Sequence, residues 1–427
     1  MPKYEAYKDS GVEWIGAIPV HWNSFPLCAK SKLKSISNNE NEELLSVYLD
    51  KGVIKFDDVD AKRTNTTSSD LTKYQLVDPG DFVLNNQQAW RGSVGVSDYR
   101  GIVSPAYLVL SLSEDIVPRF GNYLFRDGAM VANYLVSSKG VGTIQRNLYW
   151  PQLKRALVFL PPTEEQLLIA CFLDKKTAKI DEAISIKEKQ ISLLKERKQI
   201  IIQQAVTQGL DPNVPMKDSG VDWIGKIPAH WDIVPGFTVF KEGKDSNKGM
   251  IESQVLSLSY GNIIIKPEEK LVGLVPESFE TYQIALPGDI IIRCTDLQND
   301  KTSLRTGIVR NKGIITSAYL NLRLKTEHSA EFMHYFLHVL DITKTIYRFG
   351  SGLRQNLSYK DFKHMRILMP PKAEQIEIVN YINNQVEVTE SSIDLIKNKI
   401  EKLKEYKTTL INSAVTGKIK ITPEMVE

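Results

Sequence analysis

The chain contains one motif twice, and this repeat limits its possible folds more than any other sequence feature. Residues 8–22 read KDSGVEWIGAIPVHW and residues 217–231 read KDSGVDWIGKIPAHW, at an offset of 217 − 8 = 209. Only three of the 15 positions differ between them. Solenoid repeats span about 20–50 residues. A period near 209 instead predicts two copies of a whole module, an internal pseudo-dimer.

Shorter matches continue along both copies in the same order. The pairs are Pro79-Gly80-Asp81 with Pro287-Gly288-Asp289, Ala106-Tyr107-Leu108 with Ala318-Tyr319-Leu320, Pro161-Pro162 with Pro370-Pro371, Leu194-Lys195-Glu196 with Leu403-Lys404-Glu405, and Ala205-Val206-Thr207 with Ala414-Val415-Thr416. Each copy therefore repeats a globular part followed by a second, different part.

The first part of each copy has the pattern of a compact α/β (α+β) head. Short β-branched or aromatic runs bounded by Gly, Pro, Asn or Ser predict strands. These runs are residues 81–84 and 102–112 in copy one and 255–259, 289–293 and 314–324 in copy two. Helical periodicity is expected at residues 120–136 and 330–348.

The second part of each copy predicts one long helix. Residues 164–208 and 372–416 contain neither Gly nor Pro, and Gly209 and Gly417 stand where C-terminal caps are expected. Thr163 with Gln166 is expected to form an N-terminal capping box. Four domains follow: 1–160 (head 1), 161–209 (first helix), 210–369 (head 2), and 370–427 (second helix and tail).

Both helices carry an apolar seam at alternating spacings of three and four residues, the pattern of a coiled coil. Lys187 and Lys198 interrupt it in the first helix and Lys407 in the second, and Lys198 and Lys407 are equivalent by the offset of 209. Their stems are expected to lie along the seam edge, with a role in register or partner contact as the alternative. Pairing of the two helices would bury both seams, but spacing does not fix their direction. The seam residues are Ile180, Ile184, Ile191, Leu194, Ile201, Ala205, Ile393, Ile396, Ile400, Leu403, Leu410 and Ala414.

Composition excludes several classes of protein. The net charge of +3 gives no global argument for nucleic acid, so any basic surface must be local. Three dispersed cysteines predict neither a disulfide framework nor a cysteine-ligated zinc site. Without a signal peptide pattern or a run of about 18 apolar residues, we expect a cytoplasmic protein.

No catalytic motif stands out. The chain lacks a phosphate-binding GxxxxGK[ST] loop and an HExxH metal motif. His21 and His230 are expected to pack or cap turns, and Trp14 and Trp223 to anchor the cores of the heads. No metal site and no catalytic residue are predicted. A single-chain nuclease is the weak alternative, with carboxylates at Asp81 and Asp289.

Polar loops differ between the copies while the framework motifs match, which predicts two heads that read different half-sites. Arg suits guanine and Asn or Gln suits adenine in a major groove, whereas Lys and Ser suit phosphate. The candidate DNA-binding residues are Asn86, Gln87, Arg91, Ser93, Lys139, Arg146 and Asn147 in copy one, and Arg293, Gln298, Asn299, Lys301, Arg305, Arg354, Gln355 and Asn356 in copy two.

With these motifs in order, the chain resembles the specificity subunit of type I restriction–modification systems. The resemblance rests on the repeated 15-residue motif, on GIVSPAYLVL and GIITSAYLNL, on LPPTEEQ and MPPKAEQ, and on AVTQGLD and AVTGKI. It implies two target recognition domains that read a split double-stranded DNA target. It also implies two long helices that pair antiparallel and hold two methyltransferase subunits.

The same resemblance implies that this chain is not itself an enzyme. The methyltransferase subunits would bind S-adenosylmethionine, flip out the target adenine and methylate its N6. A separate restriction and motor subunit would use ATP and Mg. A stand-alone DNA-binding regulator is the alternative. Removal of residues 370–427 is expected to abolish assembly while leaving both heads folded.

Overall fold

The protein, described here by a computed structural model, consists of two compact units. The structure describes residues 1–49, 51–58, 70–141, 145–267, 269, 278–294, 304–325, 327–346 and 357–426. Unit 1 comprises residues 1–187 and 397–427, and unit 2 comprises residues 188–396. Each unit therefore combines one head with half of each long helix, a grouping that differs from the four consecutive domains expected from the sequence.

Head 1 is built on an antiparallel four-stranded sheet in the order β4-β11-β8-β9. These strands are β4 (Ser31–Lys34), β8 (Asp81–Asn85), β9 (Val94–Val96) and β11 (Tyr107–Leu112). The expected strand over residues 102–112 is two strands, β10 (Gly101–Val103) and β11. Pro105 lies in the interruption and has no N–H with which to continue a ladder.

Two-stranded antiparallel pairs surround this sheet: β1 with β2, β3 with β14, β5 with β6, β7 with β10, and β12 with β13. Their bounds are β1 (Tyr7–Asp9), β2 (Ala17–Pro19), β3 (Asn23–Pro26), β5 (Leu45–Tyr48), β6 (Gly52–Lys55), β7 (Gln75–Val77), β12 (Ser138–Val141), β13 (Gln145–Leu148) and β14 (Leu157–Leu160). The helices of head 1 are α1 (Pro118–Arg126), α2 (Gly128–Val136) and α3 (Trp150–Leu153).

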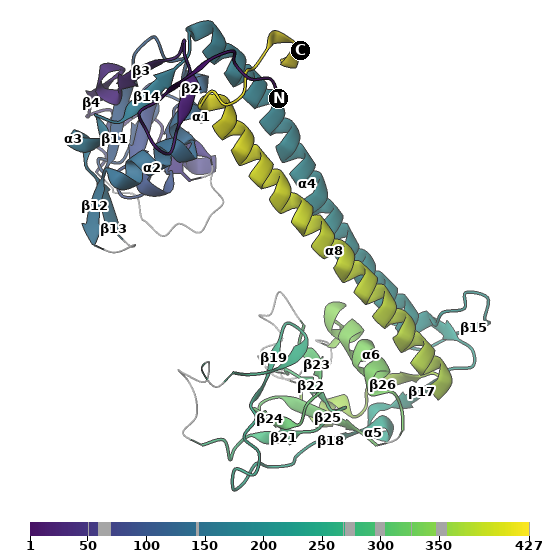
Figure 1. Ribbon diagram of the computed structural model, residues 1–427. Coiled ribbons are helices and arrows are strands. Elements are labelled where there is room, and N and C mark those ends of the chain that lie inside the picture. The colour runs from purple at the N-terminus through teal and green to yellow at the C-terminus, as the bar shows by residue number, and fades with distance from the viewer. Residues whose placement is uncertain are drawn as a thin grey trace. The chain divides into compact units, whose positions relative to one another are not determined.

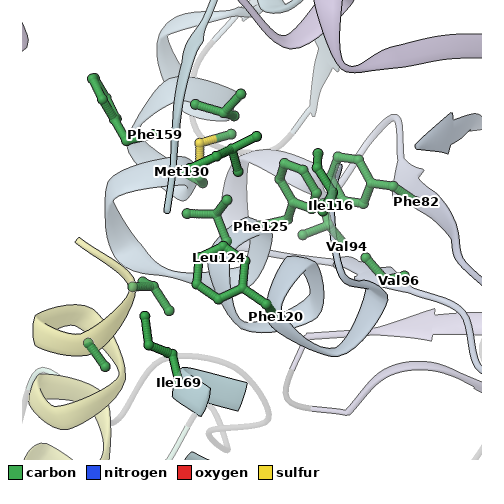
Figure 2. Close-up of a cluster of buried hydrophobic side chains, with 14 of the residues drawn as sticks. Phe82, Val94, Val96, Ile116, Phe120, Leu124, Phe125, Met130, Phe159 and Ile169 are labelled. Carbon is green, nitrogen blue, oxygen red and sulfur yellow. The ribbon is translucent and has the colours of Figure 1, made fainter. Parts of the chain in front are cut away.

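The expected helix over residues 120–136 is divided at Asp127, which has extended backbone angles and caps α2 by accepting a hydrogen bond from the Ala129 N–H. The core lies where α1 and α2 cover the sheet. The rings of Phe82 and Phe125 stack with centroids 4.3 Å apart. Figure 2 shows these rings beside Ile116 and Val94, with Ile169 of the first long helix on the other side of the cluster.

Head 2 repeats this plan with the sheet order β18-β25-β22-β23, and α6 (Ala330–Ile342) takes the place of α1 and α2. Its strands are β15 (Met216–Asp218), β16 (Lys226–Pro228), β17 (Asp232–Pro235), β18 (Phe240–Glu242), β19 (Leu256–Ser259), β20 (Asn262–Ile265), β21 (Gln283–Ala285), β22 (Ile290–Ile292), β23 (Thr306–Ile308), β24 (Gly313–Ile315), β25 (Leu320–Leu324) and β26 (Arg366–Met369). Two short helices complete it, α5 (Gly236–Val239) and α7 (Tyr359–Phe362).

The two long helices are α4 (Thr163–Gln208) and α8 (Lys372–Val415), and Figure 1 shows each as one unbroken ribbon. Within each unit, half of α4 packs antiparallel against half of α8. In unit 1, Ile180 and Leu410 lie in one core with Ile184 and Leu403 at its edge. In unit 2, Ile202 shares a core with the N-terminal part of α8. All twelve seam residues are buried or half-buried.

Lys198 and Lys407, which stand at equivalent positions of the two seams, form equivalent ion pairs between the helices. Lys407 Nζ lies 2.7 Å from both carboxylate oxygens of Asp181 in unit 1. Lys198 pairs with Glu390 in unit 2, where the Nζ–Oε1 distance is 2.5 Å. Asp181 and Glu390 are themselves related by the 209-residue offset. The lysines therefore help to set the register of the helix pair rather than only extending along its edge.

The repeated Ile-Pro-x-His-Trp motif lies where the end of one long helix meets the start of the other. In unit 1, Trp22 is fully buried, and the Glu165 carboxylate of α4 accepts hydrogen bonds from Trp22 Nε1 at 3.1 Å and contacts His21 Nε2 at 2.8 Å. Gly417, which ends α8, packs so closely on Pro19 that a Cβ there would lie 2.4 Å from Pro19 Cδ.

Unit 2 has the same junction with the roles of the helices exchanged. Trp231 is fully buried, and His230 Nε2 lies 2.7 Å from Oε2 of Glu374 in α8. The helix end is now Gly209 of α4, where an added Cβ would lie 3.4 Å from Trp231. Gly209 and Gly417 have φ angles of 74° and 71°, so both are the left-handed caps that the sequence predicts.

Three expectations from the sequence are wrong. Gln166 forms no capping box: its Oε1 accepts from the Val117 N–H at 2.9 Å and its Nε2 donates to the Asp115 carbonyl, joining α4 to the start of α1. Trp14 is no core anchor, because 52% of its surface is exposed, whereas Trp22 and Trp231 are fully buried. Trp223 is partly buried against the core of unit 2.

The third wrong expectation is that both heads stay folded when residues 370–427 are removed. The second long helix contributes Leu410, Ala414 and Val415 to the core of unit 1 and Ile378 and Ile382 to the core of unit 2. Loss of these side chains would expose apolar surface on both heads. No helix among the described residues is long and apolar enough to cross a membrane.

We predict that Gly417→Ala destabilises unit 1 by more than backbone strain alone. The added methyl would collide with Pro19 as well as occupy a positive φ, so the loss of unfolding free energy should be about 1–3 kcal/mol beyond the strain. Gly11→Ala is the matched control, since Gly11 has a φ of 73° and no atom within 4 Å of the added Cβ. Thermal unfolding of both variants measures the difference, and equal losses would contradict the close packing.

Candidate nucleic-acid interface

In head 1, the structure brings most of the candidate DNA-binding residues together around one turn and one hairpin. Asn86, Gln87 and Arg91 lie on the turn that follows β8 and contains the short 3-10 helix η3 (Ala89–Arg91). Lys139 lies on β12 and Arg146 and Asn147 on β13, where Lys139 pairs with Asn147. A hydrogen bond from the Leu148 N–H to the Asn86 carbonyl at 3.0 Å joins the hairpin to the turn.

The centre of this group is Trp90, which the sequence analysis did not select. The guanidinium carbon of Arg91 lies 4.8 Å from the Trp90 ring centroid, and that of Arg146 lies 5.8 Å from it. The indole N–H donates to the Gln87 carbonyl at 3.0 Å, which fixes the ring. A tryptophan face is the preferred partner for guanidinium groups, so it holds both arginines in place.

A second aromatic ring supports the lysine of the same surface. Lys139 Nζ lies 3.6 Å from the centroid of the Tyr149 ring, which is 42% exposed. We name the surface formed by Trp90, Arg91, Lys139, Arg146 and Tyr149 the cationic–aromatic surface. The signal that could have indicated it in the sequence is the aromatic residue next to a basic one in Trp90-Arg91.

Two candidate residues do not belong to a surface. Ser93 is 5% exposed, and its hydroxyl donates to the Val47 carbonyl at 2.9 Å. Arg305 is 2% exposed, its backbone N–H donates to Asp341 and its guanidinium donates to the Arg293 carbonyl at 3.1 Å. Both side chains serve the interior of their heads, so we leave them out of the interface.

In head 2, Arg293 is exposed at the end of β22, in the position that Asn85 occupies in head 1. The Leu357 N–H donates to the Cys294 carbonyl at 3.1 Å, which repeats the Leu148–Asn86 link of head 1. The remaining candidates lie outside the described residues: Gln298, Asn299, Lys301, Arg354, Gln355 and Asn356.

The aspartates of the nuclease alternative stabilise turns. Asp81 Oδ2 accepts from the Asp78 N–H at 2.8 Å and pairs with Lys34. Asp289 Oδ2 accepts from the Leu286 N–H at 2.9 Å and pairs with Arg323 at 2.8 Å. Across the described ranges, no group of three or more His, Cys, Asp or Glu side chains is arranged to hold a metal ion.

Comparisons with known proteins agree on one class. No family model matches the sequence. A Methanocaldococcus jannaschii protein, provisionally assigned as the specificity subunit of the type I restriction enzyme MjaX, is 23% identical over 95% of this chain and 96% of its own length. Among solved structures, the HsdS subunit from Thermoanaerobacter tengcongensis has a TM-score of 0.54 and 17% identity, covering 94% of this chain and 98% of that one.

A further solved structure, described as the basis of complex assembly and conformational transition of the type I R-M system, has a TM-score of 0.66. It is 16% identical and covers 93% of this chain and 98% of its own. The fold is thus that of two α/β heads alternating with two long helices. The resemblance to type I specificity subunits, stated from the sequence motifs, is confirmed over almost the whole chain.

We predict that Ser93→Ala affects stability and not DNA binding. Removal of the buried hydroxyl from its hydrogen bond to Val47 should lower the unfolding free energy of unit 1 by about 1 kcal/mol. The salt dependence of DNA binding should stay unchanged. A decrease of about one in the slope of log affinity against log salt would instead identify a phosphate contact.

Proposed function

We propose that this chain is the DNA-recognition subunit of a type I restriction–modification complex. It would read a split double-stranded target, one half with each head. The observation that carries the proposal is the combination of a shared framework with differing polar loops. The junctions, sheets and helix seams repeat between the copies, whereas the turn after β8 and the segment after β22 share neither length nor composition.

The cationic–aromatic surface supports this role for head 1. Arginine pairs with guanine edges through two parallel hydrogen bonds, and lysine contacts phosphate. Because Trp90 and Tyr149 already hold the cationic groups, less conformational entropy is lost when DNA binds. Exposed Gln87 and Asn147 add amide groups of the kind that read adenine.

A scaffold role is supported by apolar side chains that the fold leaves exposed at equivalent positions. On the long helices, Leu167 in unit 1 and Ile376 in unit 2 are 53% and 48% exposed and are related by the 209-residue offset. Ile186 and Leu395, 52% and 56% exposed, form a second such pair. Repeated surfaces suit two copies of one partner, here two adenine-N6 methyltransferase subunits.

In this proposal the chain supplies recognition and assembly, and its partners supply the chemistry. S-adenosylmethionine would bind to the methyltransferase subunits, and ATP and Mg to a restriction and motor subunit. The nuclease alternative is less favoured, because its candidate carboxylates, Asp81 and Asp289, form hydrogen bonds that stabilise turns. The regulator alternative gives no reason for apolar side chains to be exposed at equivalent positions of both helices.

The test is methylation by the assembled complex. Co-expression of this chain with its cognate methyltransferase should methylate adenine N6 at a split motif, two short defined halves around a fixed gap. Within that complex, Arg146→Ala should relax recognition in one half only and Arg293→Ala in the other, each by about 1–3 kcal/mol per base pair read. Genome-wide mapping of N6-methyladenine measures both effects.

Equal loss of methylation at all positions of the motif would identify these arginines as phosphate contacts. A continuous motif, or an intact complex that does not methylate DNA, would contradict the assignment of one half-site to each head. Glu327→Ala is a suitable control, since this side chain is 95% exposed and pairs with Lys372, which is not a candidate residue.

We further predict that Leu167→Glu together with Ile376→Glu lowers the number of methyltransferase subunits bound. Placing carboxylates in an apolar contact opposes docking at both equivalent positions. Leu33→Glu is the matched control, because Leu33 is 52% exposed on β4 and its counterpart in head 2 is already Glu242. Native mass spectrometry reads the stoichiometry, and full occupancy in the double variant would exclude these positions from the docking surface.

A further inference from the structure

Unit 2 contains a cavity of about 360 Å3 where the long helices meet head 2. Its wall combines residues of α4, α6 and α8 with residues of the β19–β20 hairpin and the segment around β23. This volume is in the range of small-molecule sites. The polar and charged lining residues are Lys198, Gln199, Tyr260, Asn262, Arg310, Glu331, His334, Tyr335 and His338.

Two permanent cations border the cavity from different elements. Lys198 of α4 is 19% exposed and pairs with Glu390 of α8. Arg310, which follows β23, is 65% exposed and lies 3.3 Å from Glu331 of α6. The Arg310–Glu331 distance is longer than that of a strong charge-assisted hydrogen bond, so the guanidinium has further donors to offer.

Two histidines stand one helical turn apart on α6 and face this cavity, with ring centroids 6.3 Å apart. Burial is the main reason that the pKa of His334 is lowered to about 4, and the neighbouring His338 and Arg310 contribute to the decrease. Burial also lowers the pKa of His338 to about 4, with a contribution from Lys198. Both rings are therefore neutral at pH 7, so Lys198 and Arg310 are the cationic groups of the lining, each already beside one carboxylate, Glu390 and Glu331.

One ring nitrogen has no hydrogen-bond partner among the residues that the structure describes. His334 Nε2 is buried and makes no hydrogen bond within the described part of the protein. His338 Nε2 lies 3.3 Å from Gln199 Oε1, a long contact. An unpaired buried polar atom costs free energy that a ligand hydrogen-bonded to it would recover, and after protonation of the ring this nitrogen is a donor.

Unit 1 lacks this arrangement. The Val117 N–H donates to Gln166 and the Ser329 N–H donates to Gln375, so α1 and α6 correspond at an offset of 329 − 117 = 212. At that offset His334 corresponds to Asn122 and His338 to Arg126. Asn122 is satisfied, since its Oδ1 accepts from the Val96 N–H at 3.2 Å. The histidine pair is thus a property of the second copy and is not needed for the shared fold.

We propose that the cavity of unit 2 is a binding site for a phosphoryl group, held by Lys198, Arg310 and the His334–His338 pair. The two cations supply the charge, and His334 Nε2 donates to a phosphoryl oxygen once the ring is protonated. Tyr260, 82% exposed at the rim, and Tyr335 offer aromatic walls to whatever carries the phosphate. The source is either a free phosphate ester or the backbone of bound DNA.

The experiment follows the protonation of the rings in the full-length chain. The protein has six histidines, so selective 15N labelling of imidazole gives a simple spectrum. Titration with inorganic phosphate at pH 6.5 should move the His334 and His338 resonances toward protonated values with saturation. An anion close to both rings raises their pKa, whereas the resonances of exposed His364 should not move.

His334→Asn, which places the residue of copy one in copy two, should weaken phosphate binding by about tenfold and leave thermal unfolding cooperative. His364→Gln is the matched control and should bind like the parent chain. Non-saturating shifts, equal shifts at all six histidines, or unchanged binding in His334→Asn would overturn the proposal.

A second titration, with a short DNA duplex in place of phosphate, separates the two sources. If the duplex moves the same resonances and competes with phosphate, the group is a DNA phosphate; if phosphate alone moves them, it is a free ester. Only the interpretation of the titration with DNA rests on the proposed function. The phosphate titration needs no methyltransferase, so its failure and the absence of a split methylation motif are independent results.

Discussion

The buried tryptophan at each helix junction is the contact on which the rest of the fold depends. Trp22 and Trp231 fix the place where one long helix starts and the other ends, and a glutamate at each start holds the neighbouring histidine. A glycine at each end allows the backbone to approach closely: an added Cβ would collide with Pro19 at Gly417 and would lie in tight contact with Glu374 at Gly209. This explains why the 15-residue motif is the best-preserved part of the repeat: it must fit both helices at once.

The sequence predicted the elements that repeat and the residues with local signatures. The long helices were expected within two residues of their observed ends, and both glycine caps were found, because absence of Gly and Pro and a helical period are local properties. The role of Gln166 could not be predicted, since its partners Val117 and Asp115 lie about 50 residues away. The contacts that group each head with half of each long helix also join residues far apart in the sequence, so no local pattern indicates that grouping.

The candidate site was predictable in composition and less so in geometry. Loop residues such as Arg91 and Arg146 were identified by chemistry, and the fold brings them to one tryptophan. Ser93 and Arg305 were misjudged because serine and arginine are usually exposed, whereas here each satisfies a carbonyl inside its head. The histidine pair of α6 gave no signal, because its meaning depends on Lys198 and Arg310, which are distant in the chain.

The division of the chain into a continuous and a discontinuous unit has a consequence for biosynthesis. Unit 2 is the single stretch 188–396, so it can close soon after that stretch leaves the ribosome. Unit 1 needs Leu410, Val415 and Ile421 for its core, and the Lys420 N–H donates to the Pro2 carbonyl at 2.9 Å. The core of the head made first is therefore completed only after translation has passed Ile421, so that the first part of the chain to be made is the last to have all of its contacts.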